Sequence, residues 1–493
     1  MAIGSAHILV ASLRGGDATS HHTFDLVRGL RGQGIDVRVF YEDQARDLPE
    51  EIDAVTSQAR YADYTPSADL TIVQYAVWFH LADRLRDAPG ASIFWYHGVT
   101  PPALWGSDAG AGYLEVAQLR TALAWHAHLA VAASPFTAQE LHQHSGYPLA
   151  RIRVVPLAVP VEELAHAPDP ATLDALRRRL HLTGKRVLLY IGRIAGNKRI
   201  DLLIEALALL RPTHPDLHLL IVGDTDLNDA ARQLTAQHRQ LAAARQVAGQ
   251  VIWTDRVAQV KPYLYLAALA VLPSRHEGFG VPLVEAMAAG VPVVAGAEGA
   301  LPWVIGAGEP EDTPDAAAGL LFAPDNAADL ARQIRRILDD PALRADLVRR
   351  GRLRAQRYTP ARLAVHVAQV VEEARGLAAA GRPPVPAAHQ HPLFDYYDVA
   401  LRGYQVNSGL PLVGRWVAAV RRAITSHVKE AYLDRIVERQ VDYNSLLALE
   451  VARLQEEVRR LQAELAALRR DRAQAENRQD EHKQAKGNED KTP

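Results

Sequence analysis

Short apolar runs alternate with amphipathic segments along the first 380 or so residues of the chain. In the first half, the runs that predict buried strands cover residues 7–12, 36–41, 70–75 and 92–96, and residues 18–31 show the period of a helix. Strands that are apolar on both faces are typical of a parallel sheet, and the helical segments between them supply the crossovers. The first half therefore predicts a doubly wound α/β domain, which we place at residues 1–165.

A second series of the same kind follows a break at residues 165–170. It predicts strands over residues 186–191, 217–222, 251–253, 270–273 and 292–295, and helices over residues 198–210, 329–338, 344–354 and 360–377. We place this second doubly wound domain at residues 183–356 and a closing helix at residues 357–380. The length of 493 residues supports a division, because single hydrophobic cores stop growing at about 250–300 residues.

Beyond residue 380 the composition changes. Residues 381–395 are rich in proline and predict a linker. Residues 396–443 predict a basic amphipathic helical region, residues 444–470 a coiled coil and residues 471–493 a disordered tail. The basic region suits two placements, on anionic lipid or against the α/β domains, and its sequence leaves both open.

Composition narrows the class of protein. With 48% hydrophobic residues, 23% charged residues and a formal net charge of -2, the chain resembles an ordinary enzyme and offers no bulk positive charge to nucleic acid. The absence of cysteine excludes disulfides and thiolate zinc sites. Residues 1–10 lack the features of a signal peptide, and charges or prolines interrupt every run that approaches the length of a bilayer. We therefore expect a cytoplasmic protein, with at most peripheral contact with the inner face of a membrane.

The segment 274–290, SRHEGFGVPLVEAMAAG, concentrates the candidate chemistry. It follows an apolar run and opens a predicted helix, with Pro282 near the first turn where a missing amide does no harm. The backbone amides of residues 279–281 would face outward at the positive end of the helix dipole, an arrangement that binds anions. Two carboxylates, Glu277 and Glu285, lie eight residues apart and would border the crevice beyond the strand.

This segment resembles the Glu-x7-Glu signature of the family 4 retaining glycosyltransferases, which have the GT-B fold of two Rossmann-like domains facing across a cleft. The resemblance implies that Glu277 contacts the hydroxyls of a donor sugar and that Glu285 binds the ribose. It also implies a nucleotide-diphosphate sugar as a substrate, no separate cofactor, and four further donor-binding residues, namely Gly278, Phe279, Gly280 and Val281. The alternative is a glycine-rich strand-to-helix turn of an unrelated α/β protein.

A second element lies one strand earlier in the same domain, where Gly192 and Arg193 are followed by Lys198 at the start of a predicted helix. It is similar to the Gly-Arg and lysine pair of the same family. Two cations beside a helix N-terminus suit a diphosphate leaving group, because its negative charge grows in the transition state. Arg193 and Lys198 would supply that charge without a metal. The alternative is that Lys198 is a solvated surface residue.

The first domain offers Gly15 and Gly16 after its first strand and His97 after a later one. Glycines at such a turn let backbone amides approach a phosphate or sugar closely. In the family, the first-domain histidine at such a strand end borders the reacting sugar, which makes His97 the candidate. A hydrogen-bonded structural histidine is the alternative.

Asp224 and Val257 complete the donor-binding residues that the resemblance implies, in a Gly-Asp turn and in the segment that precedes the nucleotide loop. Asp224 and Asp226 also spell the Asp-x-Asp that binds a metal in another glycosyltransferase fold. We interpret the pair as the turn after a strand, and we expect no metal site.

The resemblance implies sugar transfer to a glycan or lipid-linked acceptor by front-face attack, with retention of the anomeric configuration. It extends to bacterial enzymes of surface-polysaccharide synthesis. His97, Arg193, Lys198 and Glu277 are the expected catalytic residues. Two alternatives stay open: a sugar-nucleotide epimerase of the same fold, and a scaffold with vestigial transferase domains. Nucleotide release without acceptor would separate the three.

The C-terminal heptads predict a homo-oligomer. Seven apolar residues recur at spacings of 4, 3, 4, 3, 4 and 3, namely Leu447, Val451, Leu454, Val458, Leu461, Leu465 and Leu468. Valine at two a positions with leucine at d favours a parallel dimer, although a trimer or one helix folded back on its own domain is the alternative. Light scattering should show at least a dimer for the full chain and a monomer after truncation near Arg382. Monomers in both samples at micromolar concentration would contradict the coiled coil.

Overall fold

The computed structural model describes residues 3–105, 108–308 and 316–386, and Met1–Pro386 cluster into one unit. The predicted coiled coil, the basic region and most of the predicted linker lie outside these residues.

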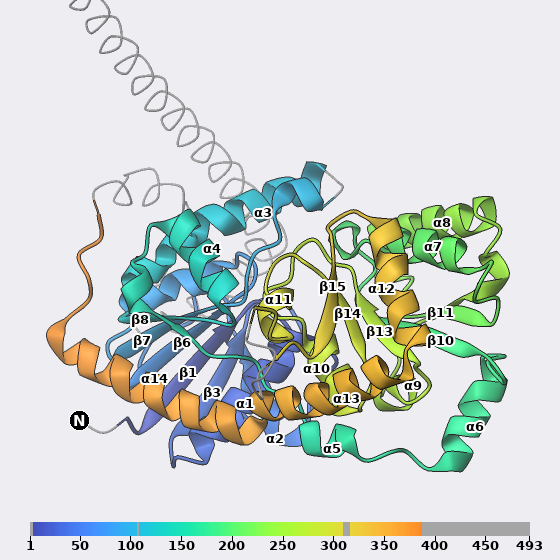
Figure 1. The fold of residues 1–493 in the computed structure, drawn as a ribbon. Helices are drawn as coiled ribbons and strands as arrows, with labels where there is room; N and C mark the ends of the chain where they lie inside the picture. Colours follow the sequence, from blue (N-terminus) through green and yellow to red (C-terminus); the bar gives the residue numbers. More distant parts are fainter. Residues whose placement is uncertain (1–2, 106–107, 309–315, 387–493) are drawn as a thin grey trace, which may run out of the picture. The chain divides into compact units, whose positions relative to one another are not determined.

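The first sheet contains seven parallel strands in the order β5-β3-β1-β6-β7-β8-β9 (Figure 1). These strands are β1 (Ser5–Val10), β3 (Asp36–Tyr41), β5 (Thr56–Gln58), β6 (Leu70–Tyr75), β7 (Ala91–Tyr96), β8 (Leu129–Ala132) and β9 (Ile152–Val154). A short ladder pairs β2 (Leu13–Arg14) with β4 (Ala45–Arg46). The helices of this half are α1 (Ala18–Arg31), α2 (Glu50–Asp53), α3 (Asp108–Leu119) and α4 (Pro135–Ser145), whereas α5 (Val161–Ala165) buries Val161 and Leu164 in the core of the second sheet.

The second sheet contains six parallel strands in the order β12-β11-β10-β13-β14-β15. They are β10 (Arg186–Ile191), β11 (Leu217–Val222), β12 (Val251–Thr254), β13 (Leu269–Leu272), β14 (Val293–Gly296) and β15 (Gly319–Phe322). The helices here are α6 (Pro170–Arg179), α7 (Ile200–Leu210), α8 (Asp229–Ala244), α9 (Lys261–Leu264), α10 (Val281–Ala288), α11 (Leu301–Val304), α12 (Ala327–Asp339) and α13 (Pro341–Ala355).

Each sheet reverses its strand order once, and these reversals locate the site. β1 lies between β3 and β6, and β10 lies between β11 and β13. In open parallel sheets, ligands bind beyond the carboxyl ends of the strands at such a reversal. The segments that follow β1, β10 and β13 are therefore the expected binding loops, and they carry Gly15 and Gly16, Arg193 and Lys198, and Glu277.

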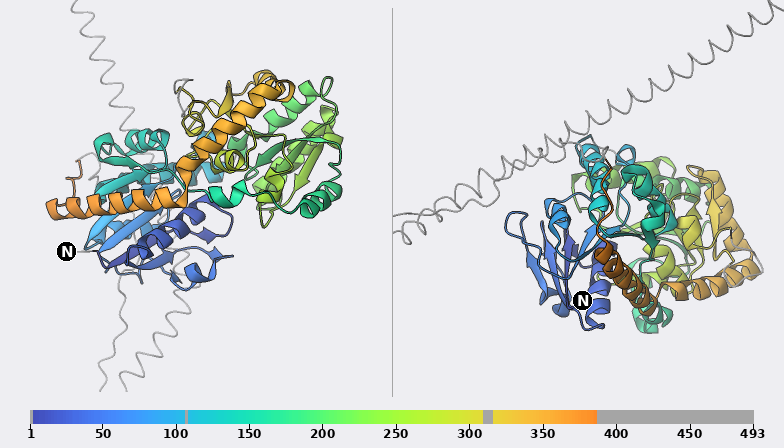
Figure 2. Two further views of the ribbon diagram at one scale, coloured as in Figure 1. Left: turned by 60° about the horizontal axis from the view of Figure 1, so that its bottom comes forward. Right: turned by 90° about the vertical axis from the view of Figure 1, so that its left-hand side faces the viewer.

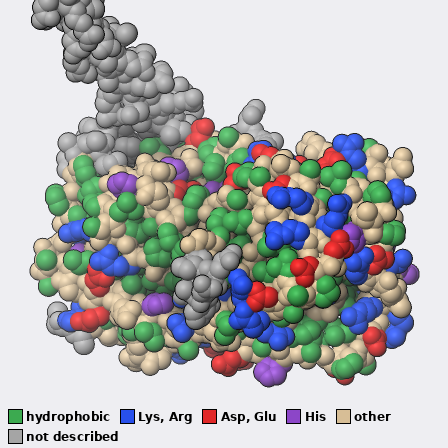
Figure 3. All heavy atoms as spheres, in the orientation of Figure 1, with side chains coloured by type: hydrophobic (Ala, Val, Ile, Leu, Met, Phe, Trp, Pro, Cys, Tyr) green, Lys and Arg blue, Asp and Glu red, His purple; other side chains and the backbone are tan. Residues whose placement is uncertain are grey.

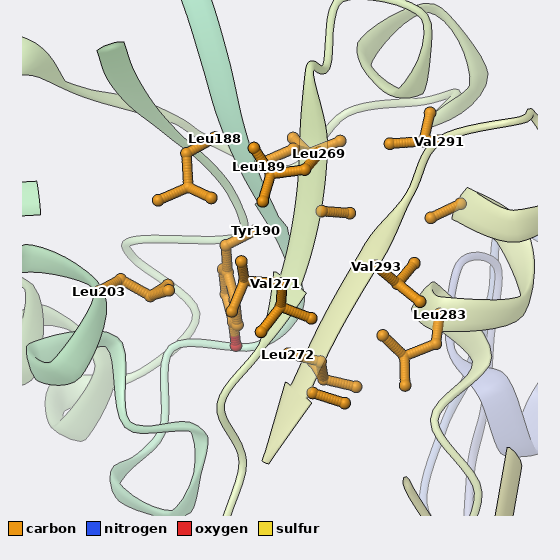
Figure 4. Packing of buried hydrophobic residues seen from close by; sticks show 14 of the residues in the cluster. Leu188, Leu189, Tyr190, Leu203, Leu269, Val271, Leu272, Leu283, Val291 and Val293 are labelled. Carbon is orange, nitrogen blue, oxygen red and sulfur yellow. The ribbon is translucent and has the colours of Figure 1, made fainter. Parts of the chain in front are cut away.

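The second sheet is buried on both faces, which explains its nearly continuous apolar strands. Leu188, Leu189 and Tyr190 of β10 are fully buried. Tyr190 lies between Leu203 of α7 and Val271 of β13, among the residues shown in Figure 4. Its hydroxyl donates to the Arg193 carbonyl oxygen at 2.8 Å, so the turn after β10 is fixed by a residue of the core.

The closing helix α14 (Pro360–Ala380) belongs to the core of the first sheet, although it follows the second sheet in the sequence (Figure 2). Leu363, Val367 and Val370 are buried in the same cluster as Ile8 of β1. The chain thus crosses between the two halves twice, and the second crossing packs a helix against the sheet where the chain began.

Part of the predicted linker is also held in place. The Arg382 guanidinium donates to the carbonyl oxygens of Arg86 at 2.5 Å and Ala88 at 2.6 Å. A truncation that tests oligomerisation should therefore end after Pro386, so that these hydrogen bonds are kept.

Exposed helices of the second half carry charges of both signs (Figure 3). On α12 and α13, Arg332 pairs with Asp329 at 2.5 Å and Arg350 pairs with Asp346 at 2.7 Å. Such exposed pairs contribute little to stability. No helix of the described residues is long and apolar enough to cross a bilayer.

Several predicted boundaries are wrong by one to three residues, for local reasons. The first strand is Ser5–Val10 and not 7–12, since Ser5 already pairs with β3 and Ser12 bonds instead to Asp43. The helix predicted from Lys198 begins at Ile200, because Arg199 precedes it in a left-handed conformation at φ 51. The sequence analysis missed β5, β8, β9 and β15, which are only three or four residues long.

Candidate active site

The loop between β13 and α10 places Glu277 against Lys198. The Lys198 ammonium bonds to a Glu277 carboxylate oxygen that also accepts from Ser274 Oγ at 2.8 Å. Both charged side chains are mostly buried, with 11% and 15% of their surface exposed. Lys198 ends the 3₁₀ turn Gly196–Lys198, so the turn after β10 and the loop after β13 meet at this ion pair.

Burial opposes the charge on both partners, and the pairing restores it. Burial by itself would raise the pKa of Glu277, but the Lys198 charge and the hydrogen bonds from Lys198 and Ser274 hold it below its usual value. Burial lowers the pKa of Lys198, which Glu277 partly counteracts. We interpret the contact as an ion pair at neutral pH, because the shift of Glu277 follows from the charge beside it.

Residues 278–281 follow Glu277 and lead into α10. Gly280, at φ 102, precedes α10, and among the described contacts the amides of residues 279–281 donate no hydrogen bond. The Phe279 side chain does not face the crevice, since it is buried against the rings of Trp303 and Tyr358. In this loop Phe279 can therefore serve a ligand only through its amide, while its ring fixes the backbone.

His97 follows β7 and lies beside the loop of Glu277, since its carbonyl oxygen closely approaches Gly278. Its Nε2 lies 2.6 Å from Oε1 of Gln74, and its Nδ1 is buried with no partner among the described residues. Burial lowers the pKa of His97 to about 4. The imidazole is therefore neutral near pH 7, which suits a hydrogen-bonding partner and not a general acid.

Two contacts join the halves at this site. A Cβ on Gly278 would lie only 2.0 Å from the carbonyl oxygen of His97, so only glycine allows this approach. The Arg256 guanidinium donates to the Gly15 carbonyl oxygen at 2.5 Å and pairs with Asp47 at 3.0 Å. The glycine loop of the first half thus faces the segment after β12.

Glu285 lies inside α10, and no hydrogen bond or ion pair of its carboxyl group is described. It is half-buried, and burial raises its pKa to about 7. A desolvated carboxyl group of this kind is suited to accept hydrogen bonds from ligand hydroxyls.

The remaining predicted residues lie around this centre. Arg193 follows β10, is exposed and has no described ion pair, and Gly192 donates its amide to Val222 at 3.0 Å. Val257 lines an open cavity of about 530 Å³ with Trp253, Asp255 and Arg256.

The Asp-x-Asp pair forms a turn. Asp224 Oδ1 accepts the amide of Asp226 at 3.0 Å, and Asp226 pairs with Arg232 at 2.5 Å. No group of three His, Asp or Glu side chains suited to a metal is found in the part of the chain that the structure describes.

Sequence reasoning missed Ser274, Arg256, Glu140 and His276, which all contact the site or its loop. Ser274 and His276 were visible within the Glu277 segment. Glu140 gave no signal, because its contact with His276 spans 136 residues of sequence.

Comparison with known families agrees with this geometry. The family described as "Glycosyl transferases group 1" matches residues 174–354, and the one described as "Glycosyltransferase Family 4" matches residues 19–163. The chain belongs to these glycosyltransferases. The first match covers the loop of Glu277 and Glu285, and the second covers His97.

Curated relatives of this family 4 chain match parts of it. Glycogen synthase of Mycobacterium tuberculosis is 38% identical over 177 residues, which cover 36% of this chain and 39% of the relative. The 2-deoxystreptamine glucosyltransferase of Streptomyces kanamyceticus is 35% identical over 208 residues, covering 41% and 49%. The chain therefore spans less than half the length of these two relatives.

Solved structures share the GT-B fold. HepE of Anabaena, in complex with UDP and glucose, superimposes with a TM-score of 0.62 at 18% identity, covering 75% of this chain and 100% of its own. Sucrose-phosphate synthase of Thermosynechococcus elongatus gives a TM-score of 0.60 at 22% identity, covering 76% and 100%. At these identities, the likeness concerns the fold alone.

The raised pKa of Glu285 makes a prediction about stability. The folded protein keeps a proton on Glu285 up to about pH 7, whereas the unfolded chain loses it near the ordinary value of 4.5, so stability falls as pH rises between these values. Glu285→Gln should therefore raise the free energy of unfolding more at pH 8 than at pH 5, and the two effects should differ by on the order of 2 kcal/mol. Thermal unfolding at both pH values measures the difference, and Glu163→Gln, at an exposed position, is the control. If Glu285→Gln changes the unfolding temperature equally at pH 5 and pH 8, the pKa of Glu285 is not raised in the folded protein.

Proposed function

We propose that this chain transfers a sugar from a nucleotide-diphosphate donor to a glycan or lipid-linked acceptor, with retention of the anomeric configuration. The observation that carries the proposal is the buried Lys198–Glu277 ion pair, at the strand-order reversal of the second sheet and beside a helix N-terminus whose amides donate no hydrogen bond among the described residues. Cationic and amide donors suit a diphosphate, and a carboxylate suits sugar hydroxyls. The family match supports the same class of donor.

Donor binding would redistribute the charges of this pair. Lys198 and the exposed Arg193 would face the diphosphate. The negative charge of the diphosphate would then take over part of the pairing that Lys198 makes with Glu277. Glu277 then accepts hydrogen bonds from the donor sugar. As the bond from the anomeric carbon to the diphosphate oxygen breaks, the two cations stabilise the charge that develops on the leaving group.

In the front-face mechanism, the leaving group accepts the proton of the acceptor hydroxyl. The acceptor hydroxyl attacks the anomeric carbon on the side from which the diphosphate departs, and the diphosphate oxygen takes the proton. His97 is neutral because its pKa is lowered to about 4, so it orients a hydroxyl without competing for that proton. Surface-polysaccharide synthesis in a bacterium is the role that we propose for the product.

Glu277→Gln tests the proposed role of Glu277 in binding the donor sugar. The amide keeps the volume and can still accept from Ser274, whereas Glu277→Ala would leave Lys198 buried without a partner and would confuse stability with activity. Turnover in a panel of UDP-, GDP- and ADP-sugars should fall about a hundredfold or more, because a charged contact to the transition state is lost. Glu163→Gln should leave the rate unchanged. Near-normal turnover of folded Glu277→Gln would exclude the assigned role.

The reaction should not depend on a divalent metal, since Lys198 and Arg193 occupy the position where a cation would neutralise the diphosphate. Transfer measured in excess EDTA should stay within about twofold of the untreated rate. A strict requirement for magnesium or manganese that disappears in the double variant Asp224→Ala and Asp226→Ala would instead assign a metal to the turn after β11.

A further inference from the structure

The loop that carries Glu277 is held by the first half of the chain through its neighbour His276. Nε2 of His276 lies 2.7 Å from a carboxylate oxygen of Glu140 on α4. Both side chains are buried, with 7% and 8% of their surface exposed. The Phe136 ring of α4 also meets the His276 ring, with centroids 5.6 Å apart. The contact therefore joins the two halves inside the protein.

Glu140 is itself fixed by the end of β7. Its other carboxylate oxygen accepts the Tyr96 hydroxyl at 2.8 Å, and that hydroxyl accepts the Val99 amide at 3.0 Å. Tyr96 and Val99 flank His97 in the sequence. One carboxylate thus connects the strand end that carries His97 with the loop that carries Glu277.

The second half holds the other side of the same loop. Asn197 accepts the Arg275 amide at 2.8 Å and donates its side-chain amide to the His276 carbonyl oxygen at 3.4 Å. Asn197 directly precedes Lys198. The loop is therefore fixed to the turn of Lys198 through its backbone and to Glu140 through the His276 side chain.

The energetics favour a role in geometry over a role in stability. A buried carboxylate–histidine pair contributes less to stability than apolar side chains of the same volume would, because both polar groups lose their water. The pair instead fixes the orientation of the His276 ring, since a hydrogen bond between fixed partners allows one position of the ring. Glu277 follows His276 directly, so this position also sets where its carboxylate lies between Lys198 and the first half.

We propose that Glu140 is a positioning residue. Through His276 it holds the loop between β13 and α10, which we call the donor loop, so that Glu277 and His97 face one bound sugar. The proposal rests on the proposed transferase function for its effect on the rate, while the contact itself does not. Lys198, Glu285 and Val257 all belong to the second half, so loss of Glu140 should impair the sugar-transfer step and spare nucleotide affinity.

The experiment compares Glu140→Ala and Glu140→Gln with Asp339→Asn, which removes the charge of an exposed carboxylate that also pairs with a buried histidine, His214, at 2.9 Å. The first readout, without any ligand, is hydrogen exchange of the amides of Arg275 and Ala300. These amides bond to Asn197 at 2.8 Å and to the Glu277 carbonyl oxygen at 3.0 Å, and they report the loop directly. The second readout is UDP affinity, and the third is kcat and KM with whichever sugar nucleotide the wild type uses.

Glu140→Ala should speed exchange of both amides at least tenfold, leave β10 and β14 protected, lower kcat at least tenfold and keep UDP affinity within twofold. Glu140→Gln should recover most of the rate, because its amide can still bond to Tyr96 and His276. Asp339→Asn should behave as wild type. His276→Asn tests the same contact from the other side, and its effects should not add to those of Glu140→Ala.

Unchanged exchange and kcat in Glu140→Ala would overturn the proposal, as would a loss of UDP affinity equal to the loss of rate. If Glu140→Ala does not fold, wild-type exchange and kcat in His276→Asn would overturn it equally. A wild type that transfers no sugar from any donor would refute the proposed function, while exchange at Arg275 and Ala300 would still decide whether Glu140 holds the loop.

Discussion

The buried ion pair between Lys198 and Glu277 is the constraint on which the rest of the site depends. Two opposite charges can lie in a largely dry crevice only because each compensates the other, and either one alone would be strongly disfavoured. Their pairing requires the turn after β10 and the loop after β13 to meet, which happens where the strand order reverses. The topology of the second sheet therefore determines where the ion pair of the site forms. In the function that we propose, a diphosphate would replace part of this pairing and meet charges that the fold already holds in place.

Backbone contacts extend this constraint to the first half. Gly278 lets the donor loop approach the His97 carbonyl oxygen so closely that a Cβ would overlap it. The Phe279 ring, which the sequence places in the donor motif, packs into the core beside Trp303 and Tyr358 and so fixes the amides on either side. The motif thus combines residues that face a ligand with residues that hold the backbone, and the letters alone do not distinguish the two.

Much of the fold could be predicted because the apolar strands are long and buried on both faces. β3, β6, β10 and β11 have the predicted bounds, and the apolar runs of β10 and β11 each end at a glycine. Short strands such as β5 and β15 are held by pairing with neighbours and have no periodicity of their own. The loop of Glu277 could be found because its chemistry is local in the sequence. Glu140 and Arg256 could not, since their functional contacts depend on how the two halves meet. The start of α7 could not be predicted for a similar reason, because the left-handed Arg199 pairs with Asp325, which is distant in the sequence.

The neutral histidines of the first half bear on which group receives the acceptor's proton. Burial holds the pKa of His22 well below its usual value, and the His22 ring lies 5.2 Å from that of His97, so a charge on either would disfavour a charge on the other. His97 bonds to Gln74, an uncharged partner, and the Asp17 charge, which by itself would raise the pKa of His97, does not offset the effect of burial. A protein base at this position would need the opposite environment. In the course that we propose, the departing diphosphate is the strongest base near the acceptor hydroxyl, and the first half contributes orientation while the cations of the second half carry the change in charge.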